Sequence, residues 1–200
     1  LRHKDQSQQI DLNISLDHIK RLLENKNIKK NVHNGYYDAS VLMNDNINVS
    51  NIAFDSMIAA HLLGKRSIGL KPLVLEYFKH EMVDITQLIG KGKNQTTIDY
   101  VSIEKTSSYA MADSYFTQKL TEIFHKELED NNLLNLYQEI EIKLISLLID
   151  MQRTGIAINE SVLKNLSNEL SDKLTIITSN IYLIVGHEFN LNSPQQLSSI

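Results

Sequence analysis

The apolar residues of this chain recur mostly at intervals of three and four positions, which is the spacing of one helix face. A helix with this spacing buries its apolar side and leaves its polar side in water. The segments that show the pattern predict helices over 37–43, 70–78, 103–128, 133–153 and 159–185. Only 7 glycines and 2 prolines interrupt the chain, so we expect the helices to be joined by short connections.

Two short apolar runs, 28–33 and 49–54, are predicted to be strands. Residues that favour helix starts mark several boundaries. Asp55 is interpreted as the N-cap of a helix that ends at Leu63, and Ser15 as the N-cap of an earlier helix. Ser193 followed by a proline predicts another start. The fold class indicated is α/β, mostly helical.

The composition is that of a globular protein without cysteine chemistry. The chain has 200 residues, 42% of them hydrophobic and 22% charged, with a net charge of −4, as in ordinary globular proteins. It has no cysteine, which excludes disulfides, cysteine-ligated zinc and a cysteine nucleophile and fits a cytoplasmic location. No apolar run is long enough for a bilayer, so we expect no membrane partner.

A polar cluster, Glu129-Asp130-Asn131-Asn132, is the predicted domain boundary. It divides the chain into a first domain, 1–130, and a helical second domain, 131–200.

Three residues could carry chemistry. Tyr109 and Asp113 are four residues apart in a predicted helix, so both side chains lie on one face. There a carboxylate could hold a metal ion while the tyrosine hydroxyl orients a water molecule. Asp38 begins a helix after a predicted strand and could project into a cleft. Each also has a simpler interpretation: the Tyr-Asp pair as a surface pair, and Asp38 as an acid that stabilises the helix start.

Several motifs in order resemble family A DNA polymerases of the polymerase I type. Asn34-Gly35-Tyr36-Tyr37-Asp38 resembles the second exonuclease motif of that family, and Tyr109-Ala110-Met111-Ala112-Asp113 resembles the third. Between them, Ile52 to Met57 and the loop Ile89 to Gln95 are similar to family segments. Ile140 to Asn159 resembles the opening of the polymerase domain, and Phe189 to Leu197 resembles its thumb motif.

The resemblance implies a ribonuclease H-like 3′-5′ exonuclease fold, followed by an all-α thumb segment. It implies two divalent metal ions, Mg²⁺ or Mn²⁺, with Asp38 and Asp113 among their ligands and Tyr109 orienting the attacking water. The implied partners are DNA, as a single-stranded 3′ end and as a primer-template duplex, and the rest of a polymerase chain. DNA contacts are implied for Asn34, and for Asn190, Asn192 and Ser193; a helix cap is the simpler interpretation for Ser193.

The family's first exonuclease motif, Asp-x-Glu, supplies further metal ligands and is not found between Leu1 and Lys30. We therefore expect an exonuclease fold that is truncated at its N-terminus, and expect the 200 residues alone to have neither nuclease nor polymerase activity. The two metal ions are expected only if the parent protein carries the Asp-x-Glu motif upstream of Leu1. A non-catalytic scaffold domain that supports DNA binding is the main alternative. An exonuclease of the ribonuclease D type is a third, which the thumb-like matches disfavour.

Overall fold

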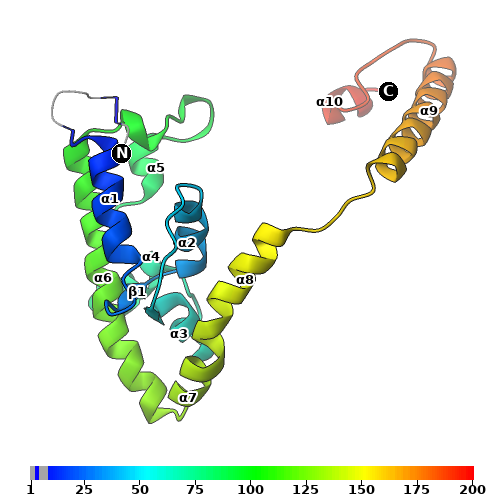
Figure 1. Ribbon diagram of the computed structural model, residues 1–200. Helices are drawn as coiled ribbons and strands as arrows, with labels where there is room; N and C mark the ends of the chain where they lie inside the picture. The colour runs from blue at the N-terminus through cyan, green and yellow to red at the C-terminus, as the bar shows by residue number, and fades with distance from the viewer. Residues whose placement is uncertain (1–2, 5–8) are drawn as a thin grey trace. The chain divides into compact units, whose positions relative to one another are not determined.

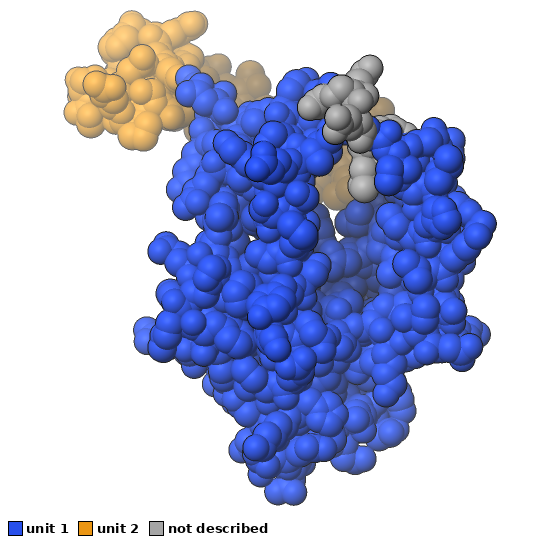
Figure 2. Space-filling model, turned by 90° about the vertical axis from the view of Figure 1, so that its left-hand side faces the viewer, with its two compact units in different colours: residues 1–154 blue, residues 155–200 orange. Residues whose placement is uncertain are grey.

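The computed structural model describes residues 3–4 and 9–200, which form two compact units, 1–154 and 155–200 (Figures 1 and 2). In the first unit, the elements through the long helix are α1 (Leu12–Leu23), β1 (Lys30–Val32), α2 (Gly35–Met43), β2 (Ile52–Asp55), α3 (Ser56–Leu62), α4 (Leu70–Phe78), α5 (Ile85–Ile89), the 3₁₀ turns η1 (Gly92–Asn94) and η2 (Ile98–Tyr100), and α6 (Ile103–Asp130). The unit ends with α7 (Leu134–Leu136), the π-helical turn η3 (Tyr137–Glu141) and α8 (Ile142–Thr154). The second unit holds α9 (Glu160–Val185) and α10 (Pro194–Leu197). The expected mostly helical α/β fold is confirmed.

The strands β1 and β2 form a parallel pair connected by α2. Lys30 pairs with Ile52 and Val32 with Asp55, with an irregularity after Lys30. A parallel pair needs a crossover connection, and the helix between the strands provides it. As a result, the end of β1 and the start of α2 lie beside the end of β2.

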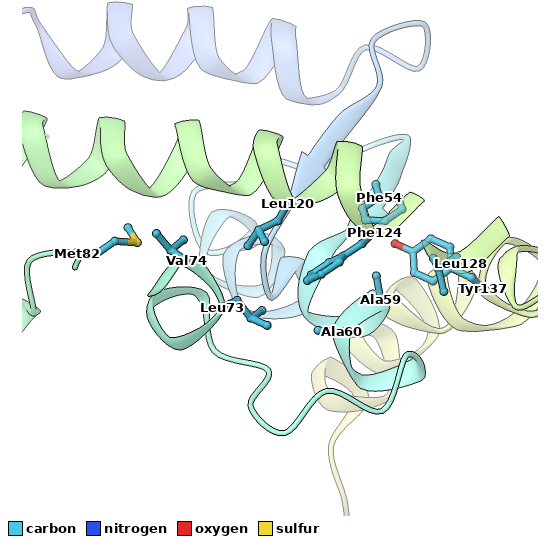
Figure 3. Close-up of a cluster of buried hydrophobic side chains, with 10 residues drawn as sticks. All are labelled: Phe54, Ala59, Ala60, Leu73, Val74, Met82, Leu120, Phe124, Leu128 and Tyr137. Carbon is cyan, nitrogen blue, oxygen red and sulfur yellow. The ribbon is translucent and has the colours of Figure 1, made fainter. Parts of the chain in front are cut away.

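The main core lies where α6 packs against α3 and α4 (Figure 3). The α6 residues Leu120, Phe124 and Leu128 are fully buried, and their spacing is that of one helix face. They meet Leu73 and Val74 of α4, which are also fully buried. Burying one such side chain contributes roughly 1.5–3 kcal/mol, so this contact fixes α6 against the sheet and α4.

Tyr137 extends the same core into the π-helical turn η3. Its side chain is fully buried, with its ring centroid 4.9 Å from that of Phe54. Its hydroxyl oxygen accepts a hydrogen bond from the Asp55 backbone N–H at 2.5 Å and lies 3.2 Å from the Asp55 carbonyl oxygen, to which it can donate. Further along, Ile145 and Ile149 of α8 pack against Ala39 of α2 in a second cluster.

These contacts place α7, η3 and α8 in the first compact unit, although they follow Asp130. The predicted boundary between a first domain, 1–130, and a second domain, 131–200, stays a prediction.

Two predicted local features differ from the structure. Helix α1 begins at Leu12 and not after Ser15, because the Asp11 carboxylate accepts hydrogen bonds from the backbone N–H groups of Asn13 and Ile14. Ser15 lies inside the helix, where its hydroxyl donates to the Asp11 carbonyl. The helix predicted over 133–153 is interrupted by the π-helical turn η3, which contains the buried Tyr137.

The second unit is built on α9, which is capped by the side chain of Asn159 and ends at Gly186 in a left-handed conformation, φ 84°. The Tyr182 hydroxyl donates to the Phe189 carbonyl at 2.8 Å and holds the following loop to the helix. Within residues 3–4 and 9–200, no helix is both long and apolar enough to cross a bilayer.

Candidate active site

A cavity of about 710 Å³ lies in the first unit, and three parts of the chain line it. The end of β1 and the start of α2 supply Asn34 and Asp38. Helix α6 supplies Tyr109 and Asp113, and the first turn of α4 supplies Lys71. The structure therefore brings the three predicted catalytic residues, and Asn34, to one cavity.

The turn that presents Asp38 is held by Asp55. Asn34 has a left-handed backbone, φ 65°, and its N–H donates to Asp55 Oδ1 at 3.1 Å. The N–H of Gly35 donates to Asp55 Oδ2 at 2.7 Å. A Cβ atom on Gly35 would lie 2.5 Å from Val32 Cγ2, so the close turn requires glycine. Asp38 then falls in the first turn of α2, where the helix dipole favours an acid.

Asp55 is the N-cap of α3, as predicted, and also a long-range acceptor. Its Oδ1 accepts from the N–H groups of Met57 at 2.9 Å and Ile58 at 3.3 Å. Its side chain is 1% exposed. One buried carboxylate thus satisfies donors from two helix starts, α2 and α3. The local cap could be predicted from sequence, but the bonds to Asn34 and Gly35 span 21 and 20 residues and leave no local signal.

The acids of the cavity influence one another electrostatically. The pKa of Asp38 is raised, first by partial desolvation and then by the negative charges of Asp55 and Asp113. The pKa of Asp113 is also raised by desolvation, whereas Lys71 and the Tyr109 hydroxyl counteract that rise. Carboxylates that repel one another in this way favour binding of a cation between them.

Sequence reasoning did not identify Lys71. Its ammonium donates to Asp84 Oδ2 at 3.1 Å and lies 5.4 Å from the centre of the Tyr109 ring. The only signal in the sequence is a lysine in the first turn of a helix, where the helix dipole disfavours a cation.

Comparison with known proteins assigns the fold that carries this cavity. Residues 3–129 match the 3′-5′ exonuclease family model of DNA polymerase A. The chain belongs to the DNA polymerase A 3′-5′ exonuclease family. Its matched segment includes Asp38, Tyr109 and Asp113, so the candidate site lies within the exonuclease region.

Relatives of the polymerase A family extend the similarity beyond the exonuclease region. The chain is 38% identical over 174 residues to DNA polymerase I of Chloroflexus aurantiacus, covering 86% of this chain and 18% of that protein. It is 30% identical over 198 residues to DNA polymerase I of Pseudomonas aeruginosa, covering 96% of this chain and 22% of that protein. The chain thus spans about a fifth of the length of these relatives.

A solved polymerase structure has a similar fold. It is the POL domain of Pol1 from M. smegmatis in complex with DNA primer-template and dNTP, with a TM-score of 0.65 at 20% identity. The similarity covers 96% of this chain and 30% of that chain, so it includes both units. The expected exonuclease-type fold followed by a helical segment is confirmed.

Exonucleases of the polymerase A family generally use divalent metals, and the acids in the cavity fit part of such a site. Asp38 and Asp113 offer the hard oxygen ligands that Mg²⁺ and Mn²⁺ prefer. Across 3–4 and 9–200, however, no group of three or more His, Cys, Asp or Glu side chains could hold a metal ion. The two aspartates therefore fit as part of a ligand set and not as a complete one.

The predicted DNA-contacting residues of the second unit form local structure at the start of α10. Asn190 Oδ1 accepts from the N–H of Asn192 at 3.0 Å, and Ser193 Oγ accepts from the N–H of Gln196 at 3.3 Å. The cap interpretation of Ser193 is therefore confirmed. The DNA-binding role of these three residues stays a prediction.

Proposed function

We propose that this chain is part of a cytoplasmic DNA polymerase I that acts in DNA replication and repair. In this proposal residues 1–130 are the C-terminal part of its 3′-5′ proofreading exonuclease, and residues 131–200 begin its polymerase domain. The nuclease substrate is a single-stranded DNA 3′ end. The polymerase substrate is a primer-template duplex, with Asn190, Asn192 and Ser193 near its backbone. The similarity to DNA polymerase I over nearly the whole chain supports this assignment.

In the proposed site, Asp38 and Asp113 are metal ligands and Tyr109 orients the water that attacks the phosphodiester. Two divalent cations, when bound, would supply Lewis-acid stabilisation of the charge that develops on the phosphate. The Tyr109 hydroxyl lies one helical turn from Asp113 and can hydrogen-bond to a water beside that carboxylate. Asn34, which also lines the cavity, would contact the DNA strand. The single observation that carries the proposal is that Asp38 from α2 and Asp113 from α6 line one cavity.

The test is a nuclease assay on the longer polymerase chain that carries these residues, with 5′-labelled single-stranded DNA and Mg²⁺. Asp113→Ala should slow removal of 3′ nucleotides by about 100-fold or more, because loss of several kcal/mol of transition-state stabilisation slows a reaction tenfold for each 1.36 kcal/mol. Primer extension by the same variant should be unchanged. Glu122→Ala is the matched control, since Glu122 is an exposed acid on α6 that does not line the cavity. Equal nuclease rates for the two variants would refute the assignment.

A scaffold domain that binds DNA without cutting it is the second candidate. The observation in its favour is that the described ranges, 3–4 and 9–200, contain no group of three potential metal ligands. A wild-type polymerase with normal primer extension but no nuclease activity in either Mg²⁺ or Mn²⁺ would favour the scaffold. An Asp-x-Glu motif upstream of Leu1 in that polymerase would favour the nuclease.

A further inference from the structure

Lys71 is one of two lysines in the wall of a cavity that also contains Asp38 and Asp113. Its side chain is 28% exposed, whereas Lys29, which also lines the cavity, is an exposed residue. The ammonium lies 5.4 Å from the Tyr109 ring centroid, so it is on the α6 side of the cavity, beside the Tyr-Asp pair. A partly buried lysine loses hydration and side-chain entropy, and an anionic partner offsets that cost.

Asp84 is that partner, and its own position is fixed. It is the N-cap of α5, and its Oδ1 accepts from the N–H of Thr86 at 2.8 Å and from the Thr86 hydroxyl at 2.7 Å. Its other oxygen, Oδ2, accepts from Lys71. Asp84 does not line the cavity, whereas Lys71 does. The pair therefore anchors Lys71 through an acid outside the cavity, while the partly exposed lysine itself lines the cavity, where it can meet a ligand.

An ammonium has three N–H donors; Asp84 accepts one, and the Tyr109 hydroxyl is a second polar neighbour of the ammonium. A DNA phosphate that approaches Asp38 and Asp113 meets like charge, and a nearby lysine reduces that repulsion. Lysine is a compact point charge that suits a phosphate oxygen. The cavity also presents the Tyr109 ring, and DNA-binding cavities commonly combine a cation that contacts the backbone with an aromatic face.

We propose that Lys71 binds a phosphate oxygen of single-stranded DNA in this cavity, and that Asp84 orients the lysine without touching the DNA. The inference rests on the proposed function for the identity of the ligand. It adds to the Asp38, Tyr109 and Asp113 site a residue whose task is substrate binding. Because no metal ligand is involved, the contact can be tested in binding experiments without any metal.

The experiment measures binding of a fluorescein-labelled oligothymidylate to the 200-residue chain by anisotropy, in EDTA, over a series of salt concentrations. Lys71→Gln should weaken binding about fivefold at low salt, since one phosphate contact is lost, and should reduce the slope of log K against log[salt] by about 0.7. Lys71→Arg should restore both values, because it keeps the charge. Asp84→Asn should bind as tightly as the wild type, or more tightly, since it removes a negative charge and frees the ammonium.

Lys65→Gln is the matched control. Lys65 also pairs with an acid, Glu127, and lies 5.3 Å from the centre of a tyrosine ring, that of Tyr77, but it does not line the cavity. Its replacement should leave the DNA affinity and the salt slope unchanged. Far-ultraviolet circular dichroism and urea unfolding of each variant show whether an effect on binding comes from loss of fold.

Three results would overturn the inference. The first is a wild-type chain that does not bind the oligonucleotide, and the second is a Lys71→Gln variant with unchanged affinity. The third is equal weakening by Lys71→Gln and Asp84→Asn, which would make the ion pair a structural link between α4 and α5. The proposed function has a separate test: a polymerase that loses nuclease activity on Asp113→Ala would keep its assignment even if Lys71 proved to have no part in DNA binding.

Discussion

Replacement of Asp55 by alanine tests whether one buried carboxylate holds the candidate site together. The variant loses the N-cap of α3, which costs about 1 kcal/mol. It also leaves the N–H of Gly35, and that of Asn34, without their acceptor. A buried donor left unsatisfied costs about 1–3 kcal/mol, and Asn34 is only partly buried. We therefore expect Asp55→Ala to reduce the free energy of unfolding by about 3–5 kcal/mol.

The measurement is urea unfolding followed by circular dichroism. With a slope of about 2 kcal/mol per molar urea, a loss of about 4 kcal/mol lowers the midpoint by about 2 M. Asp11→Ala is the matched control, because Asp11 makes the same two local cap bonds, to Asn13 and Ile14, on an exposed helix start. It should cost only about 1 kcal/mol. If the two variants lost the same stability, the long-range bonds to the Asn34–Gly35 turn would contribute nothing and the reasoning would be wrong.

Three further variants probe the surroundings of Asp55. Tyr137→Phe keeps the buried ring but removes the hydroxyl that bonds to the Asp55 backbone, so urea unfolding should show a loss of about 1–2 kcal/mol; no loss would mean that this bond is dispensable. Gly35→Ala places a methyl group 2.5 Å from Val32 Cγ2 and should cost about 1–3 kcal/mol by the same assay, whereas a neutral effect would show that the turn can widen. Burial lowers the pKa of His33 below its ordinary value of 6.5, with Asp55 partly opposing. The unfolded chain therefore takes up the proton first as the pH falls below about 6.5, and stability should decline from there down to the folded pKa. His33→Asn should lose less stability than the wild type between pH 7.5 and 5, and identical losses would exclude His33 as a source.

Local features of the fold could be predicted because their causes are local. The caps at Asp55, Asn159 and Ser193 each depend on a side chain that reaches an N–H two or three residues ahead. The start of α1 was misplaced because Asp11 and Ser15 are both good capping residues and the apolar spacing allows either. The π-helical turn had no signal, since it forms where Tyr137 enters a core built by residues far earlier in the chain.

The candidate site was only partly accessible from sequence. The spacing of Tyr109 and Asp113 predicts a shared helix face, and that prediction needs no tertiary information. That Asp38 joins them came from the resemblance alone, because no pattern within α2 or α6 encodes the approach of one helix to the other. The Lys71–Asp84 pair could not be predicted for the same reason. Lys71 lies in α4 and Asp84 caps α5, and each residue alone is typical of a solvent-exposed surface.

The burial of Tyr137 bears on where this chain could be cut into parts that still fold. A fragment cut at residue 130, one residue after the exonuclease family match ends, would lack the Tyr137 ring that packs on Phe54. It would also lack Ile145 and Ile149, which pack against α2. The segment that matches the exonuclease family is therefore shorter than the first compact unit. We expect a fragment that folds to need the chain through Thr154, because α7, η3 and α8 complete the interior of the first unit.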